Sequence, residues 1–230
     1  MDLAHRVCLV TGASSLVGRA ICRRLARQGV HLVATDVAGE SAEALVAELG
    51  GVAFRSDLRE PRDATALVAH VEQRVGPIDL VCWNAPAIEP GGIDLPDAAW
   101  RDELNASFLA YLGLTRLVVP DMIRRGQGWL VSVAAWDAWR APSAPPATLA
   151  VIGDAVAALT RWLGDHYGVR GLRTLALAPP ALGSPGVPTK QHGERPVHPD
   201  GVAALFLAEL QRVADATDLH PRTTTEPAPL

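Results

Sequence analysis

Short apolar runs alternate with longer helical patterns along most of the chain. RVCLVTG (6–12) and IDLVCWNA (78–85) are typical of the short runs, in which nearly every residue is apolar. The segments between them carry apolar residues three or four positions apart, as amphipathic helices do. Strands that are buried on both faces and separated by helices form a parallel sheet with helices on both sides. The sequence therefore predicts an α/β domain with a doubly wound parallel sheet of about six to seven strands.

The alternation continues without a linker or an internal repeat, which predicts one domain over residues 1–214. The last helix is expected at about 200–214, and no apolar run follows it that would supply a further strand. Residues 215–230 include the Pro- and Thr-rich stretch HPRTTTEPAPL. Such a composition buries little apolar surface, so we expect this tail to be disordered.

Composition argues against several classes of partner. The chain has 21 Lys and Arg against 25 Asp and Glu, so it lacks the basic surface that nucleic acids and anionic membranes require. No apolar run approaches the ~20 residues that span a bilayer. The three cysteines, Cys8, Cys22 and Cys82, show neither disulfide nor metal-ligand spacing. This pattern favours a cytoplasmic protein with reduced thiols and no metal site.

A Gly-rich turn, TGASSLVG (11–18), follows the first strand and opens the first helix. Between Gly12 and Gly18, backbone N–H groups can meet a pyrophosphate. Asp36 ends the second strand, where a carboxylate would bind an adenosine ribose, and Asp57 follows the third strand. The chain resembles the short-chain dehydrogenase/reductase family, which has a Rossmann-type fold. The resemblance rests on these residues and on SDL (56–58), WNAP (83–86) and LTRLVVPDMIRRGQGWLVSVAA (114–135).

The resemblance implies a dinucleotide-dependent oxidoreductase, but the chain departs from the family pattern along the dinucleotide path. Three glycines of that path are replaced, by Leu16, Pro86 and Pro180. Glycine leaves room for a ligand against bare backbone, so bulkier residues obstruct it. We therefore expect no bound cofactor, with Gly12, Gly18, Asp36 and Asp57 as vestiges of the site. If any cofactor binds, we expect NAD rather than NADP, because a carboxylate at the ribose disfavours a 2′-phosphate.

The family's catalytic residues are also replaced. The resemblance implies Asn, Ser, Tyr and Lys at positions where this chain has Ser107, Ala135, Leu149 and Gly153. The tyrosine transfers a proton and needs the nearby lysine, because an unperturbed phenol has a pKa near 10. The chain contains no Tyr-x-x-x-Lys at all, and its only lysine is Lys190. No residue is therefore predicted to be catalytic in the family's manner.

Another group of residues could line a pocket at the carboxyl edge of the sheet, where doubly wound domains bind ligands. Trp136, Asp137 and Trp139 follow the fifth strand, and Trp83 ends the fourth. A tryptophan-lined pocket would suit an apolar substrate, and burial would raise the pKa of Asp137 into a useful range. The alternative is that the tryptophans fill the volume that a nicotinamide would occupy, since aromatic clusters more often pack than catalyse.

The helices expected at 97–125 and 147–167 indicate assembly. ATLAVIGDAVAALTRWL (147–163) is almost wholly apolar or small, as in a helix that is buried on every side. In the family these two helices form the dimer interface. The resemblance thus implies pairing with a homologous active subunit or with a second copy of this chain.

Three functions remain open on this reading. The first is a catalytically inactive subunit that supports an active NAD-dependent dehydrogenase in a heteromeric complex, an arrangement known in the family. The second is a cofactor-independent, non-redox enzyme of cyclase or isomerase type that uses the Trp-lined pocket. The third is an NAD-dependent oxidoreductase with an atypical proton relay.

Overall fold

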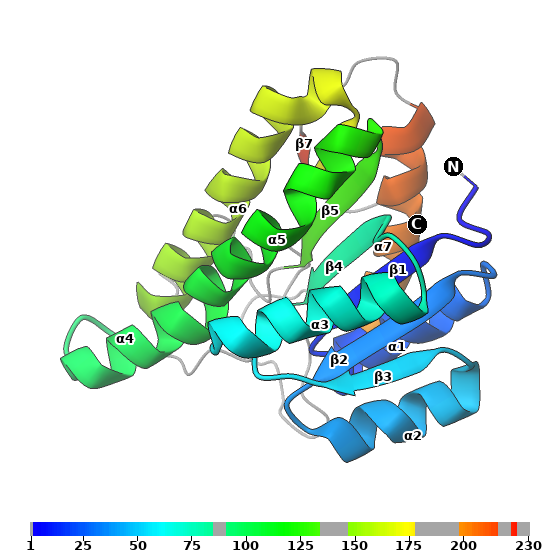
Figure 1. Cartoon of the computed structure of the whole chain (residues 1–230). Coiled ribbons are helices and arrows are strands. Elements are labelled where there is room, and N and C mark those ends of the chain that lie inside the picture. Colours follow the sequence, from blue (N-terminus) through cyan, green and yellow to red (C-terminus); the bar gives the residue numbers. More distant parts are fainter. Residues whose placement is uncertain (1, 85–90, 134–146, 178–197, 216–221, 225–230) are drawn as a thin grey trace.

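The computed structural model describes residues 2–84, 91–133, 147–177, 198–215 and 222–224. Within these ranges the strands are β1 (Val7–Thr11), β2 (His31–Asp36), β3 (Val52–Arg55), β4 (Leu80–Asn84), β5 (Gly128–Val133), β6 (Leu172–Leu177) and β7 (Arg222–Thr224). They form one sheet in the order β3-β2-β1-β4-β5-β6-β7, and all neighbours are parallel (Figure 1). The predicted doubly wound α/β fold is confirmed.

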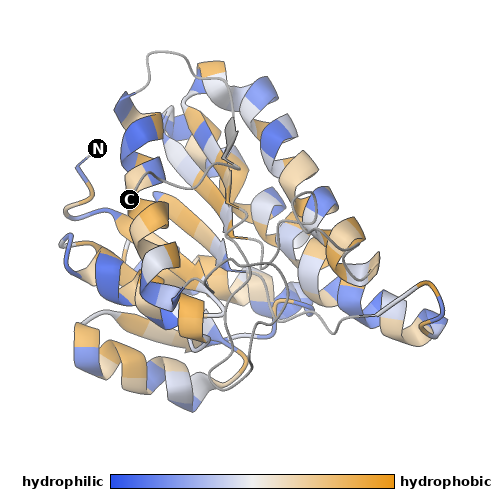
Figure 2. Ribbon diagram, turned by 180° about the vertical axis from the view of Figure 1, so that it is seen from behind, coloured by the Kyte–Doolittle hydropathy of each residue, from blue (hydrophilic) through white to orange (hydrophobic). Residues whose placement is uncertain are grey.

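Helices cover both faces of the sheet (Figure 1). One face carries α1 (Leu16–Ala26), α2 (Gly39–Leu49) and α7 (Pro199–Asp215), and the other carries α3 (Pro61–Arg74), α5 (Ala110–Arg125) and α6 (Ala147–Tyr167). Successive strand residues point to opposite faces, so each strand contributes to two cores. In β1, Cys8 and Val10 belong to the core under α1 and α7, whereas Val7 and Leu9 belong to the core under α3 and α5. Figure 2 shows the hydrophobic strands at the centre of these layers.

The helix predicted over 97–125 is divided into three parts. α4 (Asp97–Leu104) leads into a π-helical turn, Asn105–Leu109, and α5 follows directly. A π-turn inserts an additional residue into the helix and changes the direction of the side chains around it, and such turns are frequent at functional sites. The periodicity of apolar residues does not reveal an insertion of one residue.

The chain beyond the last helix differs from the expectation of no further strand. β7 lies within the tail that was predicted to be disordered, and it pairs with β6 between Arg222 and Leu175 and between Thr224 and Leu177. An edge strand pairs through its backbone and needs no apolar run, and threonine favours extended structure. The remaining tail residues, 216–221 and 225–230, lie outside the described ranges.

The expectation about membrane-spanning length also needs correction. Two helical stretches, Asp97–Arg125 and Ala147–Arg170, are long and apolar enough to cross a bilayer. Core helices meet the same criterion because they are apolar where they pack, and α5 and α6 both pack on the sheet. These stretches are therefore weak indicators of a membrane span. The cytoplasmic location stays a prediction.

Candidate functional site

The first turn lies at the carboxyl edge of the sheet, between β1 and β4, where the order of the strands reverses. In doubly wound folds ligands bind at this point. Asn84, at the end of β4, fixes the turn, because its Nδ2 donates to the carbonyl oxygen of Gly12 at 3.0 Å and to Oγ of Ser15 at 2.9 Å. Oγ of Ser15 also accepts the N–H of Gly18 at 3.0 Å and so caps α1. Asn84 and Ser15 thus hold the two ends of the turn together through hydrogen bonds to Gly12 and Gly18.

Asp36 joins the end of β2 to this turn. Its Oδ2 accepts the Ser14 hydroxyl at 2.6 Å and the Ser14 backbone N–H at 3.0 Å, and its Oδ1 accepts the N–H of Ala38 at 3.2 Å. A carboxylate has about four lone-pair positions, so three of them are already occupied. Asp36, which was predicted to bind a ribose, therefore accepts hydrogen bonds from Ser14 and Ala38 of the protein itself.

The retained glycines of the turn have contacts that explain them without a ligand. Gly12 has a φ of +55°, and a Cβ there would lie 2.9 Å from the Asn84 side chain. A Cβ at Gly18 would overlap the carbonyl oxygen of Gly12 and lie 2.9 Å from Cα of Ala13. Leu16, at the position of the family's remaining glycine, is 62% exposed at the start of α1. The fold thus needs Gly12 and Gly18, whereas position 16 is open to a side chain.

Asp57 lies near the end of β3 and is paired with a neighbour. Its Oδ2 lies 2.6 Å from Nη2 of Arg59, and this hydrogen bond is the main cause that lowers the pKa of the Asp57 carboxyl. Its backbone N–H donates to Oδ2 of Asp63 at 3.0 Å. The pair closes a local turn before α3, which is sufficient to explain an aspartate here.

The described residues at the family's catalytic positions supply little chemistry. Ser107 lies fully buried in the π-helical turn, and its Oγ has no hydrogen-bond partner. Leu149 is half-buried in the first turn of α6, and a Cβ at Gly153 would meet no atom within 4 Å. Ala135 lies outside the described residues. None of these side chains replaces a phenol or an ammonium group.

Tyr111 is the one tyrosine near this region, and it is a core residue. Its hydroxyl lies 2.7 Å from Oγ1 of Thr160, which lies 3.1 Å from Oγ of Ser132. Burial raises the pKa of the Tyr111 hydroxyl well above its ordinary value, and these hydrogen bonds offset only part of the effect. A fully buried phenol with a raised pKa is unsuited to proton transfer with a substrate. The sequence offered no signal for this network, which joins α5, α6 and β5.

Of the predicted tryptophan pocket, the structure describes only Trp83. Its side chain is 2% exposed and packs on Tyr111, with ring centroids 5.4 Å apart. Trp83 thus belongs to the core under α3 and α5, although its Nε1 has no hydrogen-bond partner. The other residues of that prediction, and two of the predicted obstructions, lie outside the described ranges: Trp136, Asp137, Trp139, Pro86 and Pro180.

The described residues contain no cluster of three or more His, Cys, Asp or Glu side chains that could hold a metal ion. The sequence analysis did not identify Ser14, whose hydroxyl donates a hydrogen bond to the Asp36 carboxylate. A serine inside the Gly-rich turn was the available signal, since serine hydroxyls commonly bond to nearby groups in turns.

Comparison with known proteins places this geometry in context. The family model described as short chain dehydrogenase matches residues 6–194. The oxidoreductase UcpA of Salmonella typhimurium is 27% identical over 225 residues, covering 94% of this chain and 85% of that protein. The dehydrogenase/reductase SDR family member 4 of Homo sapiens is 32% identical over 185 residues, covering 77% and 66%. The relatives are thus named as oxidoreductases or dehydrogenases.

Solved structures show the same architecture. A hydroxysteroid dehydrogenase from Escherichia coli superposes with a TM-score of 0.82 at 22% identity, covering 96% of each chain. A xylitol dehydrogenase with bound NAD⁺ has a TM-score of 0.73 at 25% identity, covering 80% of this chain and 73% of that one. The second structure is at odds with the expectation of no cofactor, so that expectation stays a prediction.

Proposed function

The chain belongs to the short chain dehydrogenase family, and on this premise we propose that it is a catalytically inactive member that pairs with an active, NAD-dependent relative. The observation that carries the proposal is the absence of any Tyr-x-x-x-Lys from the whole sequence. Tyr111 does not compensate, because burial raises its pKa. Without this pair the family's proton transfer has no donor near neutral pH.

The state of the first turn supports the absence of a bound dinucleotide. About one lone-pair position of Asp36 is open to a ribose, and a second hydrogen bond would have to displace Ser14, which supplies two of the three hydrogen bonds to the carboxylate. The pyrophosphate would meet the Leu16 side chain at the start of α1. We infer that the residues present do not fit a dinucleotide held in the family's manner, and no step of a reaction is assigned to one.

The outward surfaces of α5 and α6 support the proposal that the chain pairs with a partner subunit. Cβ atoms added at Gly113 or Gly153 would meet nothing within 4 Å, so bare backbone faces outward on both helices and allows close approach. Val151 and Trp162 are exposed on α6, and Leu109 is exposed at the end of the π-helical turn directly before α5. The face is less apolar than the sequence indicated, because Asp154 and Arg161 are also exposed on α6. A mixed face of this kind suits a specific subunit contact better than an entirely apolar one.

Calorimetric titration of the purified chain with NAD⁺ and NADH tests whether the chain binds a dinucleotide. We expect no saturable binding up to about 1 mM, which corresponds to a binding free energy weaker than about −4 kcal/mol. Dissociation constants in the micromolar range would instead support an oxidoreductase with an atypical relay.

Co-expression with family members that carry an intact Tyr-x-x-x-Lys tests the partner. We expect a mixed complex on size exclusion, and we expect Gly153→Arg to break it because the new side chain fills the approach surface of α6. Ala44→Arg is the matched control, since Ala44 is exposed on α2, on the opposite face of the sheet. Dissociation of the complex by both variants, or by neither, would contradict the proposed interface.

A second candidate is a non-redox enzyme that needs no cofactor. It is favoured by two buried polar atoms without partners, Oγ of Ser107 and Nε1 of Trp83. Buried polar groups usually have partners, so a small polar ligand that reached either atom would satisfy it. A self-sufficient homo-oligomer whose activity is lost in Asp137→Ala would favour this candidate over the first.

A further inference from the structure

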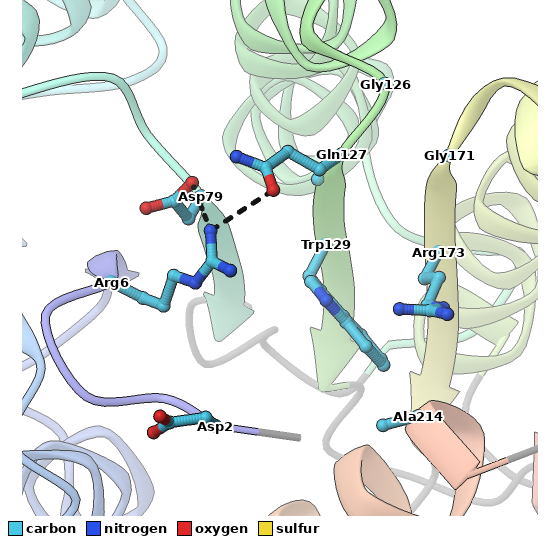
Figure 3. Close-up of a pocket in the computed structure, with 10 residues that line it drawn as sticks. Asp2, Arg6, Asp79, Gly126, Gln127, Trp129, Gly171, Arg173 and Ala214 are labelled. Carbon is cyan, nitrogen blue, oxygen red and sulfur yellow. Dashed lines mark hydrogen bonds and ion pairs between the residues drawn. The ribbon is translucent and has the colours of Figure 1, made fainter.

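A cavity lies at the amino edge of the sheet, opposite the edge where the family binds its ligands. It encloses about 360 Å³ and is formed where β1, β4, β5 and β6 begin, beside the end of α7 (Figure 3). A volume of this size is at the lower end of the range of small-molecule sites. Arg6, Asp79, Trp129 and Arg173 supply its main side chains, and Asp2 lies at its margin.

Arg173 is a charged residue at a position where the strand pattern calls for an apolar one. It lies two residues before Leu175 and four before Leu177, and both of those leucines belong to the core under α1 and α7. Alternation along β6 directs Arg173 to the same face. A charge at an inward position is costly unless something compensates it, so the environment of this guanidinium is informative.

The compensation that the protein supplies to Arg173 is incomplete. Its guanidinium stacks over the buried Trp129 ring, with Cζ 5.2 Å from the ring centroid, and the two residues are register partners on β5 and β6. In the described part of the chain its Nε is buried without a hydrogen-bond partner. Stacking covers the face of a guanidinium and leaves the N–H groups in its plane available.

A second arginine lies across the cavity, and its carboxylate partner is already shared. Asp79 Oδ1 lies 3.0 Å from Nη1 of Arg125 and 3.5 Å from Nη1 of Arg6. Its Oδ2 accepts the N–H of Val7 at 3.0 Å. Arg125 is also paired with Asp121, whose Oδ2 lies 2.6 Å from its Nε, and Arg6 donates from Nη1 to Oε1 of Gln127 at 3.3 Å. The more exposed Arg6 is therefore a cation at the cavity beside a carboxylate that two arginines share.

Other charges around the cavity are negative and limit what it can hold. Asp2 is a carboxylate at the margin, and the carboxyl ends of α5 and α7, marked by Gly126 and Ala214, direct partial negative charge toward it. These negative groups stabilise the two arginines, but Nε of Arg173 still lacks a hydrogen-bond acceptor among the described residues. A polyphosphate would bring far more negative charge to this edge than a single compact anion would.

We propose that this cavity binds a small organic anion, one carboxylate or phosphate group on a flat apolar body, held by Arg173 with Arg6 as the second cation. The planar fork of Arg173 presents two parallel N–H groups that match an oxyanion, and Trp129 fixes its orientation. Figure 3 shows Trp129 between the two arginines. The apolar body of a ligand would therefore lie beside the indole ring. The site is independent of the proposed silent subunit and of the family's cleft.

Benzoate and phenyl phosphate are suitable probes, and benzamide is the neutral counterpart of benzoate. We expect saturable calorimetric binding of at least one anion below about 10 mM, and none of benzamide. Arg173→Gln is expected to weaken binding about tenfold or more, because both parallel hydrogen bonds are lost. Arg173→Lys keeps the charge but lacks the fork, and we expect it to weaken binding at least about threefold.

Arg62→Gln is the matched control, since Arg62 is exposed on α3, away from the cavity. We expect its affinity to stay within about twofold of the unmodified chain, because screening leaves distant charges little effect. Circular dichroism and thermal unfolding show whether each variant is folded. The proposal is overturned if neither anion binds, if benzamide binds as tightly as benzoate, or if Arg173→Gln and Arg173→Lys both bind as the control does.

Discussion

Replacing Gly18 with alanine tests whether the glycines of the first turn are retained by the fold rather than by a ligand. The added Cβ would overlap the carbonyl oxygen of Gly12 and would lie 2.9 Å and 3.0 Å from two backbone atoms of Ala13. Because these neighbours are backbone atoms, the relief requires a shift of α1 away from the turn. That shift also strains the capping bond from the Gly18 N–H to Ser15.

The magnitude follows from three contributions. Overpacking of this kind costs about 1–3 kcal/mol or more, and loss of a serine cap adds about 1 kcal/mol. Alanine returns about 1 kcal/mol through its greater helix propensity. We therefore expect Gly18→Ala to lower the free energy of unfolding by about 1–3 kcal/mol, a substantial part of the usual 5–15 kcal/mol.

Urea denaturation followed by circular dichroism measures this loss, with an expected decrease of the midpoint by about 0.3–1 M for a slope near 3 kcal/mol per molar. Gly113→Ala is the matched control, because a Cβ there would meet no atom within 4 Å and should stabilise α5 by about 1 kcal/mol. If Gly18→Ala were as stable as Gly113→Ala, the contact argument would be wrong, and Gly18 would need another explanation.

Three further outcomes follow from the described contacts. Asp36→Ala should lower the free energy of unfolding by about 1–3 kcal/mol in urea, equally with and without NAD⁺, because it leaves Ser14 unpaired; protection of the unmodified chain alone by NAD⁺ would contradict this. Thr160→Val should lower the free energy of unfolding by about 1–3 kcal/mol, because it removes the Thr160 hydrogen bond of the buried Tyr111 hydroxyl. The same substitution should lower it less when it is made in the Tyr111→Phe variant. Equal losses in both backgrounds would show that the two residues are not coupled. Burial raises the pKa of all three cysteine thiols, that of Cys22 to about 12, so thiolate is scarce at pH 8. A disulfide reagent should therefore modify the folded chain far more slowly than the urea-unfolded chain. Rapid reaction of the folded chain would contradict the burial of Cys8, Cys22 and Cys82.

Much of the fold could be predicted because its signals are local. The helix expected at 147–167 is observed as Ala147–Tyr167, since its boundaries coincide with the end of a long apolar pattern. β7 was missed because an edge strand of three residues is specified by the backbone of β6 rather than by its own composition. The π-turn was missed because the apolar residues on either side of it keep a helical spacing.

The candidate sites were harder to predict because their contacts join distant segments. Ser14 and Asp36 were both visible in the sequence, but only the fold shows that the hydroxyl of one occupies the carboxylate of the other. Arg173 could have been noticed as a charge within LRTLAL (172–177). Its stacking on Trp129 depends on the register between β5 and β6, which the sequence does not specify.

The two edges of the sheet differ in what a ligand would gain there. At the carboxyl edge, Ser14, Ser15 and Asn84 already form hydrogen bonds with several polar groups of the first turn, so a ligand that used these groups would exchange existing hydrogen bonds for new ones. The net gain of such an exchange is small, because each new bond replaces one of similar strength. At the amino edge, Nε of Arg173 is buried and unpaired, so an acceptor there would remove a cost that the folded chain already bears. On these contacts we expect an anion beside Arg173 to gain more from binding than a dinucleotide that used the hydrogen-bonded groups of the first turn.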